Sequence, residues 1–264
     1  NGECPVPGLI DLKCGIGRFC AVGALVFLTA CGAAQDTATR AGGVYDPYET
    51  GNRKVHSFNK SVDTKLLRPA SKRYARFVPG EIRTTVSNFS ENLSMPAVAV
   101  NSLLQGDLRG AGLSTFRFAF NSTLGMAGLI DAATEFKVPE HDTDFGETLY
   151  VWGAGEGAYV ELPIFGPSTQ RDAVGRVVDL FTNPLSYSLE SPEKYYGTGA
   201  AYFKRLNDRD RYASTIDSIL YDSADSYAQA RLIYLQNRRF ELGNEAAAAS
   251  DDPYADPYED PYVQ

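Results

Sequence analysis

The segment "DPYETGNRKVHSFNK" (46–60) opens the first strongly patterned part of this 264-residue chain. Asp46 has the side chain that helix N-caps favour, Pro47 suits the first helical position, and Glu49 stands where a capping box carries an acid. Apolar residues follow at helical spacing, namely Val55, Phe58, Val62 and Leu66. The pattern predicts an amphipathic helix that begins at Asp46 and ends at Arg68-Pro69.

The N-terminal region is typical of a secreted lipoprotein. Lys13 and Arg18 form a positively charged region before an apolar run at 19–28, which is too short to span a bilayer. The run ends in Leu-Thr-Ala-Cys31, which resembles the lipobox of bacterial lipoproteins, and the next residue, Gly32, fits sorting to the outer membrane in that class. The alternative is a buried helix that ends in cysteine. We predict an extension plus signal peptide at 1–30, acylation of Cys31 as the lipid anchor, and a flexible tether over 31–45.

Charge is unevenly distributed along the chain. The net charge is −8, but residues 245–264 alone hold six acids and no base. Prolines recur every four residues in this part, so 243–264 is predicted to be an acidic, disordered tail. Residues 53–83, in contrast, hold nine Lys or Arg and two acids. This basic region either faces phosphate groups, in lipid or nucleic acid, or is simply a solvated helix face.

The rest of the chain predicts further helices and little or no sheet. Pro79 and Glu81 begin a second helix, which Pro96 should kink or break. The apolar segments 97–104 and 112–136 fit either a buried helical core or kinked amphipathic helices inserted into one membrane leaflet, and neither has about eighteen uninterrupted apolar residues. The remaining predicted elements are a short helix near 144–152, an extended piece at 158–165, a helix from 169 or 170, and two helices within 192–241, the second starting at Asp225-Ser226-Tyr227. We expect one all-α domain over 46–242.

Catalytic patterns are missing from the sequence. His56 and His141 are the only histidines and form no zinc-binding spacing, so we expect His56 on a helix surface and His141 in a loop. The chain has no G-x-S-x-G motif, and the glycines at 153, 155 and 157 have the wrong spacing for a dinucleotide loop. We therefore expect no enzyme, no metal and no cofactor. Asn, Ser and Thr on apolar segments instead favour a binding or transport protein with an internal polar cavity.

Long motifs in a fixed order are similar to those of one known family. They include "DPYETGNRKVHSFN", "LLRPASKRYARFVP", "VSNFSENLSMPAVAVNSLLQGD", "FRFAFNSTLGMAGLIDAA", "DFGETLYVWGAGEGAYVELPIFGPSTQRDAVG" and "YAQARLIYLQNRRFEL". Over about 44–242 the chain resembles the MlaA (VacJ) family of outer-membrane lipoproteins, which maintain lipid asymmetry. Two departures are Gly51, where the family usually has an aromatic residue, and Ser226, where it has a proline.

The resemblance implies an all-α, ring-shaped and monotopic domain of kinked amphipathic helices in the inner leaflet of the outer membrane. It implies that phospholipids misplaced in the outer leaflet pass through an amphipathic channel in the ring to the periplasmic carrier MlaC. It also implies association with trimeric porins, and no nucleic-acid partner. The alternatives are a non-transporting, porin-associated structural lipoprotein and an unrecognised hydrolase of lipid or cell wall.

The resemblance also assigns individual residues. Cys31 is the lipid anchor. The family motif at the start of the first helix corresponds to Asp46, Pro47, Asn52, Arg53, Phe58 and Asn59. The candidates for channel lining or gating are Asn88, Asn92, Asn121, Gly125, Gly128 and Asp131. Flexibility at the glycines of this second group would gate the passage of lipid.

Overall fold

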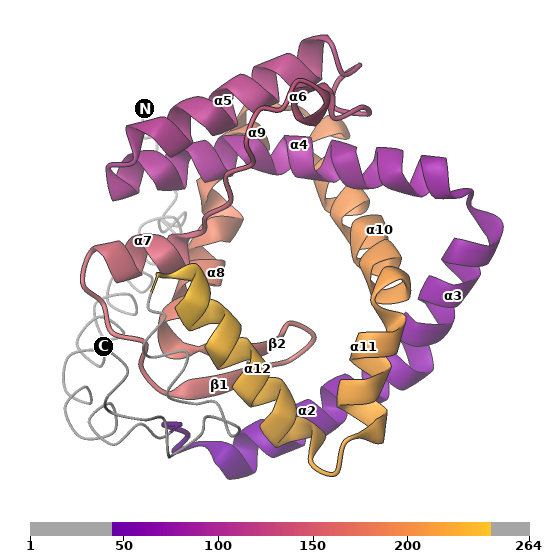
Figure 1. Ribbon diagram of the computed structural model, residues 1–264, viewed down its shortest axis with the longest axis vertical. Helices are drawn as coiled ribbons and strands as arrows, with labels where there is room; N and C mark the ends of the chain where they lie inside the picture. Colours follow the sequence, from indigo (N-terminus) through magenta and orange to yellow (C-terminus); the bar gives the residue numbers. More distant parts are fainter. Residues whose placement is uncertain (1–43, 244–264) are drawn as a thin grey trace, which may run out of the picture.

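The computed structural model describes residues 44–243, whose helices follow one another around a ring (Figure 1). Cys31, the signal peptide, most of the tether and the acidic tail lie outside the described residues. In chain order the elements are α2 (Glu49–Val62), the π-helical turn η2 (Asp63–Leu67), α3 (Arg68–Phe77), α4 (Gly80–Gln105), α5 (Leu108–Thr123), α6 (Ala132–Glu135), α7 (Phe145–Val151), β1 (Tyr159–Leu162), β2 (Gly166–Thr169), α8 (Gln170–Thr182), α9 (Leu185–Ser188), the 3-10 turn η3 (Glu193–Tyr195), α10 (Tyr196–Arg211), α11 (Ala213–Asp217), the π-helical turn η4 (Ser218–Asp222) and α12 (Ser226–Glu241).

The mostly helical, ring-shaped fold confirms the fold expected from the sequence. Within the described residues the sheet is a single antiparallel hairpin, in which β1 pairs with β2 from Tyr159↔Thr169 to Leu162↔Gly166. The extended piece predicted at 158–165 is β1, and its partner strand was not predicted. Thr169 caps α8 by accepting a hydrogen bond from the backbone N–H of Asp172, as the predicted helix start requires.

The first helix differs from its prediction at both ends. It begins at Glu49 rather than Asp46, and no side chain caps it. It does not end at Arg68-Pro69, because the π-helical turn η2 leads directly into α3. There the N–H of Arg68 donates to Asp63 O, five residues back, which shifts the hydrogen-bond register before Pro69. Pro69 therefore lies in the first turn of α3, where a missing N–H costs little, and the helical path continues to Phe77.

The next two segments match their predictions only in part. α4 runs from Gly80 to Gln105 with Pro96 inside it, so of the two predicted effects, a kink or a break, the proline does not cause a break, and the kink stays a prediction. The predicted helical segment 112–136 is interrupted after Thr123, the last residue of α5. Met126, Ala127 and Gly128 have φ values of 54°, 61° and 86°, and a helix cannot continue through three residues with left-handed backbone. The chain becomes helical again only in the short α6.

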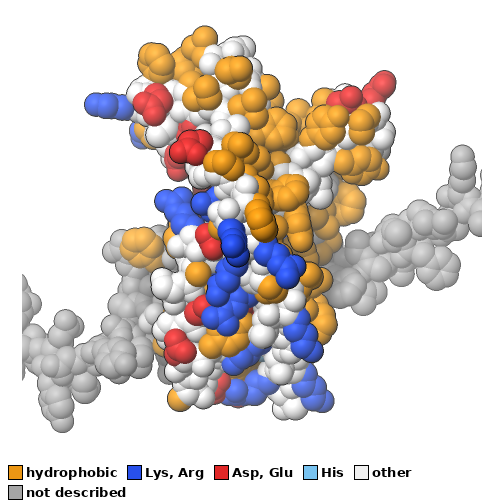
Figure 2. Space-filling view, turned by 90° about the vertical axis from the view of Figure 1, so that its right-hand side faces the viewer, with side chains coloured by type: hydrophobic (Ala, Val, Ile, Leu, Met, Phe, Trp, Pro, Cys, Tyr) orange, Lys and Arg blue, Asp and Glu red, His pale blue; other side chains and the backbone are white. Residues whose placement is uncertain are grey.

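Many large apolar side chains of the described residues are exposed. The apolar cluster of buried residues is small, with Tyr159, Tyr227 and Leu235 at its centre. By contrast, Leu108 and Phe136 are 75% and 70% exposed. Figure 2 shows apolar side chains over the upper part and along one edge of the molecule, with Lys and Arg gathered lower down. The apolar segments are therefore not simply a buried core. Nowhere in 44–243 does a helix combine the length and apolar character needed to cross a membrane.

Candidate functional site

Two asparagines of the opening motif fix β1 against α2. Asn52 donates from Nδ2 to the carbonyl of Tyr159 at 3.1 Å, and its Oδ1 accepts from the N–H of Glu161 at 3.0 Å. Seven residues later, Asn59 repeats this arrangement by donating to the carbonyl of Leu162 and accepting from the N–H of Ile164. Seven residues are two helical turns, so both amides lie on one face of α2. Each therefore pairs with one backbone acceptor and one backbone donor of β1 or of the turn that follows it.

Asp46 joins the start of the ring to its end. Its carboxylate accepts hydrogen bonds from Arg231 of α12 at 2.6 Å, from the hydroxyl of Tyr227, and from Asn52 at 2.9 Å. The side chain of Asp46 is only 3% exposed. Burial, and then the bond to Asp46, raise the pKa of Tyr227, so the phenol stays protonated and can donate. Asp46 is therefore committed to α12, which explains why it does not cap α2.

Arg53 makes a second link between α2 and α12. It binds both carboxylate oxygens of Asp225, at 3.1 and 2.8 Å. Asp225 also caps α12 by accepting from the N–H of Ala228, which confirms that helix start. The hydrogen bond from Arg53, followed by the cap, lowers the pKa of Asp225 to about 2. Of the other motif residues, Pro47 precedes α2 and Phe58 is 51% exposed.

The lowered pKa of Asp225 predicts how its contribution to stability changes with pH. The contribution is complete above the unfolded-state pKa of about 3.9 and is lost as the pH falls through the folded-state value. Asp225→Asn keeps a good helix cap and removes the charge. We expect this variant to have a lower urea midpoint than the parent at pH 7, and the difference to disappear as the pH approaches about 2. A difference that is constant with pH would contradict this assignment.

His56 is buried, which contradicts its predicted place on a helix surface. It is 6% exposed, and its ring nitrogens lie 3.3 Å from Glu161 Oε1 and 3.1 Å from Ser226 Oγ. The ring also packs edge-on against Tyr227, with 5.6 Å between the ring centroids. His56 therefore belongs to the same α2–β1–α12 contact as Asn52. Its charged neighbour is 105 residues away, so local sequence gave no sign of burial.

A second cluster is centred on Asp131, after the left-handed segment. The carboxylate accepts from Arg117 Nη2 at 2.9 Å, from Asn121 Nδ2 at 2.9 Å and from the hydroxyl of Thr134 at 2.5 Å. Burial opposes ionisation, but the bonds from Thr134 and Asn121 outweigh it, so the pKa of Asp131 is lowered. Arg117 is 2% exposed and also donates to the carbonyl of Val138 at 2.6 Å. These contacts bind the segment 124–138 onto α5.

The glycines of this segment are needed for close backbone approach. A Cβ on Gly125 would lie 2.1 Å from the carbonyl oxygen of Ile130 and 2.6 Å from that of Asn121. Gly128 has a φ of 86°, and a Cβ there would lie 2.5 Å from the Cβ of Asn92. Only glycine fits either position without movement of the surrounding chain. The proposed gating by these glycines stays a prediction.

Two asparagines of α4 contact α5 and the segment that follows it. Asn92 donates to Ser122 Oγ at 3.0 Å, and its buried Oδ1 has no hydrogen-bond partner among the described residues. Asn88 donates to the carbonyl of Leu129 at 3.5 Å. The structure thus brings all six candidates for channel lining or gating together at the contact of α4, α5 and the segment that follows α5.

Substitution by alanine should change stability in opposite directions at Gly125, which follows α5, and at Gly112, which lies within it. Gly125→Ala forces a backbone displacement, and we expect it to lower the free energy of unfolding by about 1–3 kcal/mol. Gly112→Ala is the matched control, because a Cβ at this position in α5 meets no atom within 4 Å. It should raise the free energy of unfolding by up to about 1 kcal/mol, through better helix propensity. Urea unfolding of both variants tests the contrast, and equal effects would contradict it.

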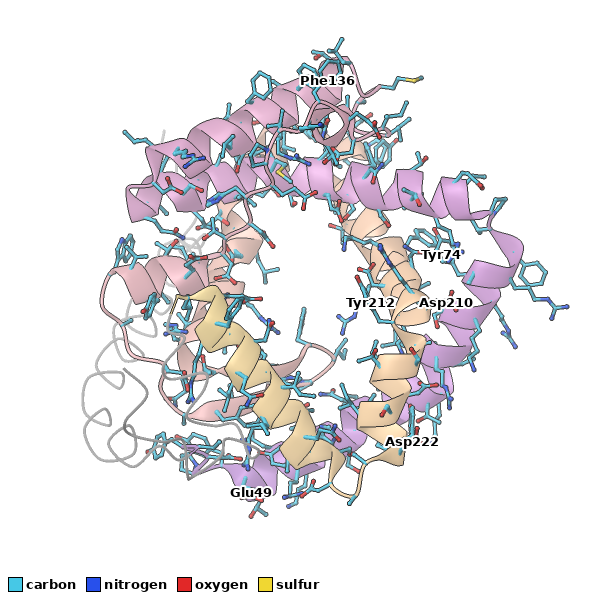
Figure 3. All side chains as sticks on the ribbon, viewed as in Figure 1. Glu49, Tyr74, Phe136, Asp210, Tyr212 and Asp222 are labelled. Carbon is cyan, nitrogen blue, oxygen red and sulfur yellow. The ribbon has the colours of Figure 1, made fainter. Side chains whose placement is uncertain are left out.

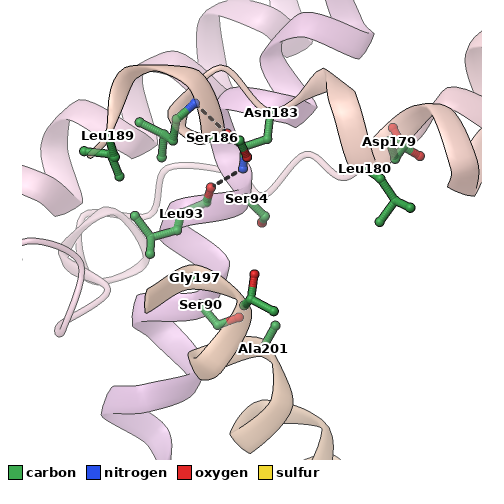
Figure 4. A pocket seen from close by; sticks show the side chains of 12 residues that line it. Ser90, Leu93, Ser94, Asp179, Leu180, Asn183, Ser186, Leu189, Gly197 and Ala201 are labelled. Carbon is green, nitrogen blue, oxygen red and sulfur yellow. Dashed lines mark hydrogen bonds between the residues drawn. The ribbon is translucent and has the colours of Figure 1, made fainter. Parts of the chain in front are cut away.

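A cavity of about 260 Å³ lies where α4, the α8–α9 region and α10 meet (Figure 4). Its lining combines leucine side chains with small polar ones, namely Ser90, Leu93, Ser94, Asp179, Leu180, Asn183, Leu185, Ser186, Leu189, Gly197, Thr198 and Ala201. Asn183 holds one wall by donating to the carbonyl of Leu93 at 2.9 Å. The mixed lining can accommodate an amphipathic group, such as part of a lipid.

The comparisons with known proteins agree with this architecture. Residues 44–241 match the family model described as MlaA lipoprotein. This chain belongs to the MlaA lipoprotein family. It is 35% identical over 214 residues to the intermembrane phospholipid transport system lipoprotein MlaA of Escherichia coli strain K12, covering 80% of this chain and 83% of that protein. It is 30% identical over 239 residues to the protein of the same name from Haemophilus influenzae, covering 88% and 92%.

A solved structure of an MlaA-like chain supports the fold directly. It comes from work on the structural basis for maintenance of bacterial outer membrane lipid asymmetry. Its TM-score to this chain is 0.61 at 33% sequence identity, and the match covers 77% of this chain and 98% of the other. The described part of the present chain is therefore an MlaA domain in both sequence and structure.

Sequence reasoning missed two further polar clusters of this MlaA domain. In the first, Arg209 of α10 binds Asp63 of η2 through two hydrogen bonds, at 2.7 and 2.8 Å, and Asp217 at 2.6 Å. In the second, Arg238 binds Asp144 at 2.7 Å and Asp172 at 3.4 Å. The partners in these contacts are up to 146 residues apart, and no local motif marks them. The sequence gives a sign only for the Asp131 cluster, where the charged Arg117 stands among apolar residues of α5.

Proposed function

We propose that this MlaA-family protein takes part in maintaining phospholipid asymmetry, by removing misplaced phospholipids from the outer leaflet of the outer membrane. The lipids would pass through an amphipathic channel enclosed by the ring and be handed to the periplasmic carrier MlaC. No covalent step is required. The driving terms are burial of acyl chains, worth about 0.8 kcal/mol per CH₂, and replacement of headgroup hydration by polar side chains.

The ring itself is the observation that carries the proposal. With the described side chains drawn, its centre stays open in the view of Figure 3. Phe136 lies at the upper rim, Glu49 and Asp222 at the lower rim, and Tyr212 and Asp210 along the right side. Apolar side chains outside the ring suit contact with a leaflet.

Anchoring and partners complete the proposal. Acylated Cys31 would hold the protein on the periplasmic side of the outer membrane, through a tether ending near Asp46. A porin trimer would place the ring next to the outer leaflet, and MlaC would collect the lipid below it. The family motif would close the ring, and Asn88, Asn92, Asn121, Gly125, Gly128 and Asp131 would line or gate the channel. These assignments rest on membership of the MlaA family.

Deletion of the gene tests the proposal directly. The deletion strain should accumulate phospholipid in the outer leaflet and become sensitive to detergent, and the parent gene should reverse both effects. Outer-leaflet phospholipid is measured by labelling intact cells with a reagent that cannot cross the membrane. An unchanged level of outer-leaflet phospholipid in the deletion strain would refute the proposal.

The alternative is a porin-associated structural lipoprotein that does not transport lipid. Ser90→Phe with Ala201→Phe would fill the cavity between α4 and α10. If the protein transports lipid, the double variant should fail to lower the outer-leaflet phospholipid of the deletion strain to the parent level, although porin still co-purifies with it. Thr84→Phe is the control, because this exposed position of α4 does not line the cavity. Full complementation by the double variant would favour the structural role.

A further inference from the structure

The outer side of α3 carries positive charge that its surroundings do not neutralise. Between Asp63 and Glu81 the sequence contains five Lys or Arg residues and no acid. One of the five, Arg68, binds Asp217 at 2.6 Å. The other four are exposed and form no ion pair with any residue in 44–243, namely Lys65, Lys72, Arg73 and Arg76. We call these four residues, of which Lys65 lies at the end of η2 and the other three in α3, the basic face of α3.

Exposed apolar side chains accompany the basic face. Leu66 and Phe77, near the two ends of this helical stretch, are 56% and 76% exposed, and Phe77 is more exposed than any other large apolar residue of the described chain. The guanidinium of Arg76 lies 5.9 Å from the centre of the Phe77 ring. The opposite side of α3 is already occupied, because Tyr74 packs against Phe203 of α10. The unpartnered side of α3 is therefore both cationic and apolar.

The charge and shape of this surface indicate what covers it. Figure 2 faces this side of the ring and shows Lys and Arg adjoining a continuous apolar area. Long, flexible cations next to exposed apolar side chains are characteristic of helices that lie in the interface of anionic membranes. A convex helix without acids gives a folded protein partner little shape or charge pattern to recognise. A layer of phosphate groups, in contrast, requires only positive charge at the correct depth.

We propose that the basic face of α3 binds the phosphate groups of anionic phospholipids at the membrane surface, with Phe77 and Leu66 inserted among the acyl chains. This contact orients the ring relative to the leaflet, in addition to the acyl anchor. It takes up one of the two interpretations of the basic region 53–83, namely headgroup contact rather than a solvated helix face. It does not depend on lipid transport, because a non-transporting lipoprotein could use the same contact.

Fluorescence quenching in vesicles tests the contact. The full acylated chain would carry Phe77→Trp as the probe and Trp152→Phe to remove its single native tryptophan. The vesicles contain phosphatidylcholine with brominated acyl chains, either alone or mixed with phosphatidylglycerol. We expect strong quenching of the Trp probe with phosphatidylglycerol at low salt, and at least about a twofold loss of quenching in high salt or without the anionic lipid.

Two triple variants separate the basic face from a general charge effect. Lys72→Gln with Arg73→Gln and Arg76→Gln should reduce quenching in anionic vesicles to the level seen in neutral vesicles. The matched control, Lys54→Gln with Lys137→Gln and Arg211→Gln, removes the same charge at exposed positions elsewhere and should quench like the parent. Near-identical circular dichroism and thermal midpoints are required of all variants.

Three outcomes would overturn the proposal. The first is equal quenching in the parent and the basic-face variant, and the second is equal quenching in neutral and anionic vesicles. The third is quenching that appears only after residues 244–264 are removed, which would show that the acidic tail of this chain occupies the basic face instead. Because no outcome measures lipid transport, failure here would leave the proposed function to its own experiment.

Discussion

Arg209→Met is expected to lower the free energy of unfolding by about 3–5 kcal/mol, which is the usual cost of removing one partner from a buried ion pair. The Arg209 and Asp63 side chains are 7% and 8% exposed, so the carboxylate left behind cannot regain water. Tyr221 would remain as its donor, at 2.8 Å, and a neutral hydroxyl does not balance the charge. For a domain of this size, the thermal midpoint should fall on the order of 10 °C.

A double variant identifies the cause of that loss. Asp63→Asn added to Arg209→Met removes the stranded charge and should recover part of the stability. Arg211→Met, at an exposed position two residues further along α10, should change the free energy of unfolding by less than about 0.5 kcal/mol. If Arg209→Met behaved like Arg211→Met, the contact between η2 and α10 would not be important for the closed ring.

Asn52→Leu is expected to have the second largest effect, because it leaves two buried backbone groups of β1 without partners. These are the carbonyl of Tyr159 and the N–H of Glu161. An unsatisfied buried group costs about 1–3 kcal/mol, so the free energy of unfolding should fall by about 2–5 kcal/mol. Asp46 also loses one of its donors. Urea unfolding, followed by far-UV circular dichroism, measures the change.

Asn52→Asp tests whether the donating nitrogen is needed. An aspartate can still accept from Glu161 N–H, but it cannot donate to Tyr159, and it adds negative charge beside Asp46. We therefore expect a loss at least as large as for Asn52→Leu. Asn237→Leu is the control, because Asn237 is exposed and bonds only within α12, to Glu241. A stable Asn52→Asp variant would contradict the role of the amide.

Local interactions were the part of this structure that its sequence predicted well. Asp225 and Thr169 were predicted at helix starts and do cap α12 and α8, because a cap needs only a backbone N–H three residues away. Asp46 has the same local signature, and its prediction as a cap was wrong. Its carboxylate binds Arg231, 185 positions along the chain, and a cation is a stronger partner for a carboxylate than a free helical N–H.

Backbone irregularities were the least predictable part. The π-helical turn that allows the chain to pass Pro69, and the left-handed residues after Gly125, depend on contacts with other elements. The candidate residues of the second group were named only through family resemblance, and their role in lining or gating a channel stays a prediction. Their actual partners, Arg117 on one side and Asn92 on the other, become visible only when α4 and α5 pack together.

The bond from Asp46 to Arg231 has a kinetic consequence. Bringing together two ends separated by 185 residues costs loop-closure entropy before any contact compensates for it, so this step is intrinsically slow. A nascent chain that emerges with its N-terminus first exposes α2 long before α12 can meet it. During that interval the carboxylate of Asp46 lacks its partners in α12, and Tyr159 lacks the apolar side chains of Tyr227 and Leu235 that later cover it. Chains with this topology therefore need protection from aggregation until their last helix has arrived.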